Sequence, residues 1–211
     1  MSSSAREQFI EAGMHLYPQY GYRQLSVRLL AAETGLSSGM FHHLFASKDD
    51  FVSELLKQKY SEGFNQLVLN VLPEQGVQQN LRQVMVFIDF FVRDHLDWIH
   101  RIFADSTEGV ACVLKFVKTH ATQHVALVLD LLKHGINQGI LVPATLSQHF
   151  CYLMSAVQLP MIVGSRLIEA GIAPDIIRSE FEHVLSDEAI RQRIEWALFA
   201  LFPDNKPQES L

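Results

Sequence analysis

Several side chains suited to contact with a nucleic acid stand close together between residues 28 and 48 of the 211-residue chain. Arg28 and Lys48 carry fixed positive charges that attract phosphate, and His42 and His43 can donate hydrogen bonds to phosphates or to base edges. Short or unbranched side chains that fit a DNA groove lie between them, namely Ser37, Ser38 and Met40. These residue types can bind DNA only if one folded element presents them on a common face.

Gly35 marks a turn between two short helices of the kind that such a face requires. A glycine can take the left-handed backbone conformation that ends a helix, and Leu36 can then turn into the core. Ser37 or Ser38 can accept a backbone N–H and begin the next helix. The pattern predicts a helix-turn-helix, whose second helix is shaped to lie in the DNA major groove.

The residues on either side of this turn favour two packed helices. Ser26 is suited to cap the first helix, in which Leu30 and Ala31 are spaced to face inward. Phe41 and Phe45 lie four residues apart in the second helix and can anchor it to the core. We therefore expect the serines, the methionine and the histidines named above to lie on its outer face.

A third helix is predicted to begin at Ser47, which can cap it. Asp49 and Asp50 fall in its first turn, where acidic side chains complement the helix dipole. Lys48 stands beside the same N-terminus, so its ammonium group and the free backbone N–H groups can share a phosphate.

Residues 6–56 resemble the N-terminal domain of the TetR/AcrR family of transcriptional regulators. The matching residues are Tyr20, Gly21, Tyr22, Ser26, Val27, Arg28, Ala31, Gly35, Leu36, Ser37, Gly39, Phe41, Phe45, Ser47, Lys48 and Phe51. The resemblance implies an all-α fold, in which an N-terminal three-helix helix-turn-helix head is joined to a larger helical body that binds a ligand and dimerises.

The resemblance also implies roles for the residues of the head. Base reading is expected from Ser37, Ser38, Met40 and His43, and contacts with the DNA backbone from Arg28, His42 and Lys48, with Arg6 adding a contact from the N-terminal arm. The family usually has a tyrosine where His42 stands and an aromatic residue or histidine where Leu44 stands, so altered contacts are expected there. Pro18 predicts a kink in the last turn of the first helix.

The net charge of the chain, −6, is unlike that of a typical nucleic-acid-binding protein, which is basic. The head is the exception. Between Glu11 and Asp49 the sole acidic residue is Glu33, and the basic residues there are His15, Arg23, Arg28, His42, His43 and Lys48. A locally basic face is sufficient because physiological salt screens charges beyond ~8–10 Å.

The sequence predicts a cytoplasmic protein without a membrane segment. Its N-terminal residues are polar and lack the apolar core of a signal peptide. The most apolar run, 150–164, is shorter than the ~20 residues of a membrane span and contains Gln158, Pro160 and Gly164. Cys112 and Cys151 are expected to be buried, reduced thiols, and a redox-sensing pair is the alternative.

Helical periodicity continues through the rest of the chain. We expect a DNA-binding domain at 1–50, an effector-binding and dimerisation domain at 51–205 and a disordered tail at 206–211. The expected helices of the body begin with one that starts at Ser47 and ends before Pro73, followed by 77–93, 97–104, 110–138, 144–167 with an interruption at Pro160, 175–185, and a last helix capped by Ser186.

The resemblance implies a homodimer formed through a four-helix bundle, with 146–168 and 187–202 as the matching segments. A dimer has an independent physical reason, because a two-fold pair of heads reads two half-sites. Apolar residues on these segments belong either to the protomer core or to the interface, and the sequence leaves both open for Phe150, Leu153, Val157, Ile194, Leu198 and Leu201.

A pocket for a small apolar or weakly polar effector is expected in the body, which is rich in large, adaptable side chains. The candidate effector-binding residues are Phe87, Phe91, Trp98, Phe103, Phe116, His120, Met154 and Gln158. His120 and His124 have the i, i+4 spacing of a metal-binding pair, but no third ligand follows at a diagnostic spacing. We therefore expect no metal and no cofactor, and solvated histidines.

The predicted function is that of a ligand-responsive DNA-binding regulator, a repressor that an effector releases from a palindromic operator in double-stranded DNA. A helical enzyme is one alternative, although the sequence has no P-loop, dinucleotide-binding glycine motif, nucleophile elbow or zinc-protease motif. A helical small-molecule-binding module without DNA recognition is the other.

Overall fold

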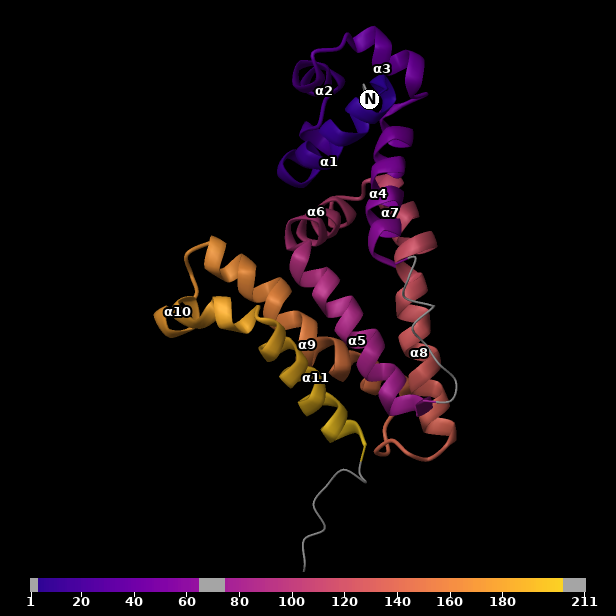
Figure 1. The fold of residues 1–211 in the computed structure, drawn as a ribbon, viewed down its shortest axis with the longest axis vertical. Coiled ribbons are helices and arrows are strands. Elements are labelled where there is room, and N and C mark those ends of the chain that lie inside the picture. The colour runs from indigo at the N-terminus through magenta and orange to yellow at the C-terminus, as the bar shows by residue number, and fades with distance from the viewer. Residues whose placement is uncertain (1–3, 65–74, 203–211) are drawn as a thin grey trace, which may run out of the picture. The chain divides into compact units, whose positions relative to one another are not determined.

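The structure, a computed structural model, describes residues 4–64 and 75–202, and every regular element in these two ranges is a helix (Figure 1). The predicted all-α fold is therefore confirmed. The helices form two compact units, the first Met1–Asn65 with Asp97–Gln123 and the second Gln66–Leu96 with His124–Leu211. The predicted end of the helix before Pro73 and the predicted tail at 206–211 lie outside the described residues.

The first unit contains the helix-turn-helix and three helical segments from later in the chain. Its elements are α1 (Ala5–Gln24), α2 (Val27–Thr34), α3 (Ser38–Leu44), α4 (Lys48–Phe64), α6 (Leu96–Thr107), α7 (Ala111–Phe116) and the π-helical turn η3 (Val117–Ala121). The segment predicted as a head at residues 1–50 thus shares a compact unit with α6 and α7.

Aromatic side chains form the core of the helix-turn-helix. The ring of Phe41 lies edge-on to the rings of Phe9 and Phe51, with centroid distances of 5.5 Å and 5.2 Å. Phe45 packs edge-on to Phe51 at 4.8 Å, and all four phenylalanines are buried. The predicted anchoring of α3 by Phe41 and Phe45 is confirmed.

The predicted caps and turn are also present. Ser26, Ser37 and Ser47 each accept a backbone N–H three residues ahead, at 3.1, 3.2 and 3.0 Å. Gly35 ends α2 with φ 71°, in the left-handed region that favours glycine. By contrast, Pro18 keeps a helical backbone inside α1, and the break in that helix is at Gly21, with φ 66°. The kink predicted at Pro18 is therefore three residues too early.

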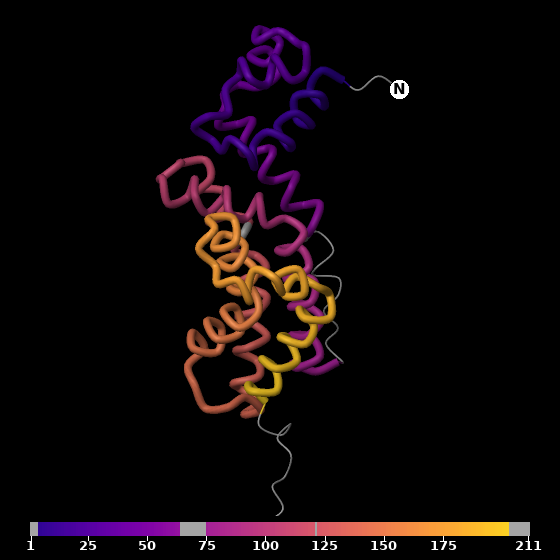
Figure 2. Tube along the Cα trace, turned by 90° about the vertical axis from the view of Figure 1, so that its left-hand side faces the viewer, coloured from indigo at the N-terminus to yellow at the C-terminus, as the bar shows by residue number. Residues whose placement is uncertain are grey.

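The second unit is built around three packed helices. Its elements are α5 (Gly76–Asp94), α8 (Thr122–Asn137, which continues from η3), α9 (Leu146–Glu169), α10 (Asp175–Val184) and α11 (Asp187–Leu201). α9 and α11 run side by side and both pack on α5 (Figures 1 and 2). Ser186 caps α11 as predicted, by accepting the N–H of Ala189 at 3.2 Å.

Two predicted details of these helices are wrong. α9 continues through Pro160 without a break, so the predicted interruption is absent. The single helix predicted over 110–138 contains a π-helical turn at Val117–Ala121, where the hydrogen-bond spacing widens. Helical periodicity in a sequence does not reveal such a turn, because it changes the register by one residue only.

Among the helices of the described ranges, α9 alone has the length and apolar composition of a membrane span. This is weak support for a span, because core helices of globular proteins share both properties. α9 also packs against α5, α10 and α11 within the second unit.

Gly13 provides a test of the packing between α1 and α4. A Cβ atom at this position would lie 2.6 Å from Cζ of Phe51 and 2.8 and 2.9 Å from the methyl carbons of Leu55, and both side chains are fully buried. Gly13→Ala is therefore expected to lower the free energy of unfolding by about 1–3 kcal/mol, measured by urea denaturation. Equal or greater stability would contradict this packing.

Gly39→Ala is the matched control. The nearest atom to a Cβ at Gly39 is Oγ of Ser37 at 3.8 Å, so alanine meets no obstacle in α3. This substitution is expected to stabilise the protein by up to ~1 kcal/mol through helix propensity.

Candidate functional site

The outer face of α3 presents the side chains predicted to read DNA. Ser37, Met40, His42 and His43 are exposed, and Ser38 is half-buried. They share the helix with Phe41, which is fully buried and fixes its rotation. The structure therefore places the predicted base-reading residues on α3 and its N-cap, with Ser37, Met40 and His43 exposed and Ser38 half-buried.

The predicted backbone contacts fall into two situations. Arg28, on α2, and His42 are exposed. Lys48 is half-buried, and its Nζ donates a hydrogen bond of 2.7 Å to the carbonyl oxygen of Tyr22. The same ammonium group lies 4.2 Å from the ring centroid of Tyr22, within the range of a cation–π contact. Lys48 is thus held at the start of α4 by the end of α1.

Arg6 is also engaged within the protein. Its Nη1 and Nη2 donate to the two carboxylate oxygens of Glu54 at 2.9 and 2.8 Å, a two-pronged ion pair between α1 and α4. Its guanidinium group lies 4.7 Å from the ring centroid of Phe45. The predicted DNA contact from Arg6 requires this arrangement to open.

Tyr22 connects three helices of the first unit. Its hydroxyl donates to Asp49 of α4, its carbonyl accepts from Lys48, and its N–H donates to Oδ2 of Asp105 on α6 at 2.9 Å. The hydrogen bond to Asp49 raises the pKa of Tyr22 to about 12. In the sequence, Tyr22 stands out only as one of the residues that match the family.

Asp105 also binds Tyr17, at the core of the same unit. The hydroxyl of Tyr17 donates to Oδ2 of Asp105 at 2.7 Å, and Asp105 is 2% exposed. Burial, followed by this hydrogen bond, raises the pKa of Tyr17 well above its ordinary value. A hydrogen bond to a buried carboxylate is among the stronger ones in proteins, so α6 is firmly attached to α1.

Two arginines extend the attachment of α6. Arg101 donates to the carbonyl oxygens of Pro18 and Gln19, both at 3.3 Å, next to the break in α1. Gly21 leaves room for it, since a Cβ there would lie 2.7 Å from Cδ of Arg101. Arg23 forms an ion pair of 2.9 Å with Glu108.

Four of the predicted effector residues belong to the first unit. Trp98 is buried against Tyr17, and Phe116 is buried against Tyr60. His120 stacks on Phe116 with a centroid distance of 5.4 Å. Phe103 is 58% exposed on α6.

The other four predicted effector residues belong to the second unit and are half-buried. Phe87 and Phe91 are four residues apart and share a face of α5, and Met154 and Gln158 likewise share a face of α9. Gln158 interacts with Asp89 of α5. Asp89 points to the opposite side of α5 from Phe87 and Phe91, since successive helical residues are separated by about 100°. The structure therefore does not bring the four together at one point.

Asp89 lies in the core of the second unit and was missed in the sequence analysis. It is 0% exposed, and its carboxylate oxygens have no partner in full hydrogen-bonding geometry, with the side chain of Gln158 close enough for a weak hydrogen bond only. Burial raises the pKa of Asp89 to about 7, and the nearby side chains of Gln158 on α9 and Arg193 on α11 oppose this shift in part. A lone acid within the apolar run 84–92, at a core-facing position, was the available signal.

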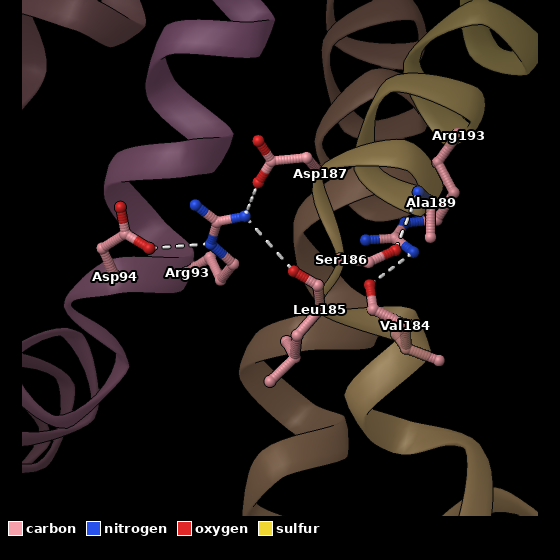
Figure 3. Close-up of polar contacts among 8 residues, drawn as sticks. All are labelled: Arg93, Asp94, Val184, Leu185, Ser186, Asp187, Ala189 and Arg193. Carbon is pink, nitrogen blue, oxygen red and sulfur yellow. Dashed lines mark hydrogen bonds and ion pairs between the residues drawn. The ribbon is translucent and has the colours of Figure 1, made fainter.

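Arg193 belongs to the corner between α10 and α11. Its Nη1 donates to the carbonyl oxygen of Val184 at 2.9 Å (Figure 3). Its Nε and Nη2 are buried and have no hydrogen-bond partner, and burial lowers the pKa of its guanidinium group. Arg93 of α5 reaches the same corner, where it binds Asp187 and the carbonyl oxygen of Leu185 (Figure 3).

The predictions for histidines and cysteines have mixed outcomes. Burial lowers the pKa of His124 to about 4, so the solvated state predicted for it is wrong. Within 4–64 and 75–202, no group of three or more His, Cys, Asp or Glu side chains is placed to hold a metal ion. Cys112 is buried, and its pKa is raised by burial to about 11, whereas Cys151 is exposed, contrary to the prediction.

Two grooves of about 390 Å³ each open on the surface, one in each unit. The groove in the first unit lies between α1 and α4 around Ile10 and Met14. That in the second lies between α5 and α8 around Val77, Leu127 and Leu131. Neither groove is lined by a predicted effector residue.

Comparison with known proteins connects this geometry to a family. The sequence profile of the bacterial regulatory proteins of the tetR family matches residues 9–55. The HTH-type transcriptional repressor KstR2 of Mycobacterium tuberculosis is 24% identical over 143 residues, which are 67% of this chain and 71% of that repressor.

Solved structures share the fold along nearly the whole chain. A transcriptional regulator from Saccharomonospora viridis in complex with choline has a TM-score of 0.69 and 16% identity, with 95% of this chain and 99% of that chain covered. FadR from Bacillus subtilis in complex with stearoyl-CoA has a TM-score of 0.62 and 14% identity, with 92% and 98% covered.

The profile match coincides with the helix-turn-helix described above, from Phe9 in the aromatic core to Leu55 beside Gly13. The sequence relative and the solved structures extend the likeness to the helices that follow. Residues 9–55 therefore form the helix-turn-helix of the bacterial regulatory proteins of the tetR family, and the rest of the chain shares the fold of TetR-family regulators.

Proposed function

We propose that this protein is a ligand-responsive repressor that binds a palindromic operator as a homodimer and leaves it when a small effector binds. The observation that carries this proposal is the exposed face of α3, with Ser37, Met40, His42 and His43 on a helix whose opposite side is fixed by Phe41. Exposed groups that donate and accept hydrogen bonds, on a helix shaped for the major groove, suit base recognition.

The start of α4 supports binding to the DNA backbone. Asp49 and Asp50 lie close to the free N–H groups there, yet each is engaged within the cap, Asp49 by the hydroxyl of Tyr22 and Asp50 by the hydroxyl of Ser47. Lys48 is held beside them. Arg28 provides a second, freely exposed charge on α2.

Dimerisation is proposed through the outer faces of α9 and α11. Of the residues left open between core and interface, Leu153, Val157, Ile194, Leu198 and Leu201 are buried within the protomer, and Phe150 is half-buried. Other apolar side chains of the same two helices are exposed, namely Tyr152, Leu159, Val163, Leu167, Trp196 and Phe199. A second copy of the chain would cover this apolar face, as in other closed two-fold dimers.

α6 is the proposed route from effector to DNA. It follows α5 of the second unit after His95 alone, and Asp105 and Arg101 attach it to the end of α1 in the first unit. An effector that binds more tightly when α6 is in one position would favour that position and the separation of the two heads that goes with it. The size of this effect equals the difference in binding free energy between the two positions. α4 is also part of this proposed route, because Tyr22 at the end of α1 binds Lys48 and Asp49 in the first turn of α4.

The effector is proposed to be a small, apolar or weakly polar molecule bound in the body. Choline and stearoyl-CoA, bound by the two structural relatives, show that this fold accepts chemically different ligands. We place the protein in the cytoplasm, where its DNA would be.

A gel-shift assay with the DNA upstream of its own gene tests the proposed function. We expect a retarded band whose stoichiometry is one dimer per palindromic site, and release on addition of the effector. No retardation at micromolar protein with any upstream palindrome would contradict DNA binding and favour a binding module without DNA recognition.

Arg28→Ala is expected to weaken binding to all DNA sequences alike and to reduce the slope of log affinity against log salt concentration by about 1, as loss of one phosphate contact does. Lys133→Ala removes the same charge from an exposed position on α8 and serves as the control, with no change expected. A loss confined to the specific operator would instead assign Arg28 to base reading.

Trp196→Glu places a charge on the proposed dimer face, where the side chain is 62% exposed. The variant is expected to sediment as a monomer at micromolar concentration and to lose operator binding, because a buried unpaired charge opposes association. Phe103→Glu, at another exposed aromatic residue, should leave the dimer intact. A dimeric Trp196→Glu protein would place the interface elsewhere.

Asp105→Asn tests the attachment of α6. The variant removes the charge that receives hydrogen bonds from Tyr17 and Tyr22, so operator affinity is expected to fall several-fold while the helical content is unchanged. Asp130→Asn, at an exposed acid of α8, is the control. Unchanged affinity of Asp105→Asn would show that α6 does not set the position of the head.

A further inference from the structure

The interior of the second unit contains charged side chains whose hydrogen-bonding capacity is not used. Asp89 is 0% exposed, and its oxygens have no partner in full hydrogen-bonding geometry, with only a weak interaction from Gln158. Arg193 has two buried nitrogens, Nε and Nη2, without partners. Unpaired groups of this kind are rare in folded proteins because each costs a large part of its solvation free energy. Unpaired buried groups are explained if they form hydrogen bonds with a bound ligand.

Three helices supply the cluster, and one of its members was already a candidate effector residue. Asp89 comes from α5, Gln158 from α9 and Arg193 from α11, and these three helices pack on one another. Gln158 and Arg193 both interact with the carboxylate of Asp89. Gln158 lies one helical turn from Met154 on the same face of α9. The cluster therefore combines buried polar groups with an apolar surface, as small-molecule sites do.

The chemistry of the cluster restricts what it can bind. Above about pH 7, where Asp89 is ionised, its carboxylate only accepts hydrogen bonds, Arg193 only donates them, and the amide of Gln158 does both. The two charges cancel. A charged ligand group would therefore leave either Asp89 or Arg193 uncompensated in the protein interior, whereas an uncharged group that both donates and accepts satisfies the two together.

We propose that Asp89, Gln158 and Arg193 form the polar end of the effector site and select a molecule with a hydroxyl or primary amide group over the corresponding amine or carboxylate. This inference rests on the proposed function in so far as the ligand is the effector. The selectivity itself belongs to the cluster and is measured without DNA.

Four probes with the same hydrocarbon chain test the selectivity, namely 1-hexanol, hexanamide, hexylammonium and hexanoate. Calorimetric titration and thermal shift are measured on the full chain. The wild-type protein is expected to bind hexanol and hexanamide, and to bind the two ions on the order of a hundredfold more weakly, because a buried charge without a partner is costly.

Two charge-removing variants should change the preference in opposite directions. Asp89→Asn leaves Arg193 uncompensated, so hexanoate should become the best ligand. Arg193→Gln leaves Asp89 uncompensated, so hexylammonium should become the best ligand. Arg191→Gln, at an exposed arginine of the same helix, should keep the wild-type order.

The Asp89→Asn protein is expected to fold. The pKa of Asp89 is raised in the folded state to about 7, so the wild-type protein loses stability as the pH rises from about 4 to about 7, and the asparagine variant does not. The stability of the wild-type protein relative to the variant should therefore fall as the pH rises from about 4 to about 7. Urea denaturation of both proteins at several pH values measures this difference. The Asp89→Asn variant alone then tests the selectivity if Arg193→Gln fails to fold.

The outcomes separate the inference from the proposed function. If no probe binds the wild-type protein, or if Asp89→Asn keeps the wild-type order, the cluster is an internal polar pair and the inference is wrong. If the probes bind with the expected selectivity but no upstream DNA is retarded, the inference stands and the repressor function fails.

Discussion

The buried carboxylate of Asp105 is the interaction on which the first unit depends. α1 breaks at Gly21, and directly after the break the N–H of Tyr22 donates to Asp105, which also accepts from the hydroxyl of Tyr17. Tyr22, fixed in this way, holds the start of α4 through Lys48 and Asp49. The first turn of α4 is thus connected through Tyr22 to Asp105, which lies 83 positions after Tyr22 in the chain.

Local features of the head could be predicted from the sequence, whereas long-range ones could not. Ser26, Gly35, Ser37 and Ser47 act on backbone groups within three or four residues, so their roles follow from residue type and spacing. Asp105 resembles any other acid near the end of a helix until its partners are known. The break at Gly21 rather than Pro18 lies beside Arg101, another long-range neighbour, which fills the space next to the glycine.

The body shows the same limit in a different form. On α9 and α11, apolar residues that face the core have the same helical spacing as apolar residues that face an interface. Periodicity alone therefore does not distinguish the two groups. The packing of both helices on α5 shows which residues are buried within the protomer. The candidate effector residues were chosen for size and aromatic character, which core residues share. Asp89, which was not among the candidates, is more informative than they are, because a carboxylate in the interior requires a specific explanation.

Gly13 and Gly35 are constrained for different physical reasons, and this difference has an evolutionary consequence. At Gly35 nothing lies within 4 Å of a Cβ, so the limit is the backbone conformation, and asparagine is an acceptable replacement without change elsewhere. At Gly13 the conformation is ordinary and the limit is the space taken by Phe51 and Leu55. Among descendants of this protein, position 35 should drift alone, whereas position 13 should vary only together with smaller side chains at 51 or 55.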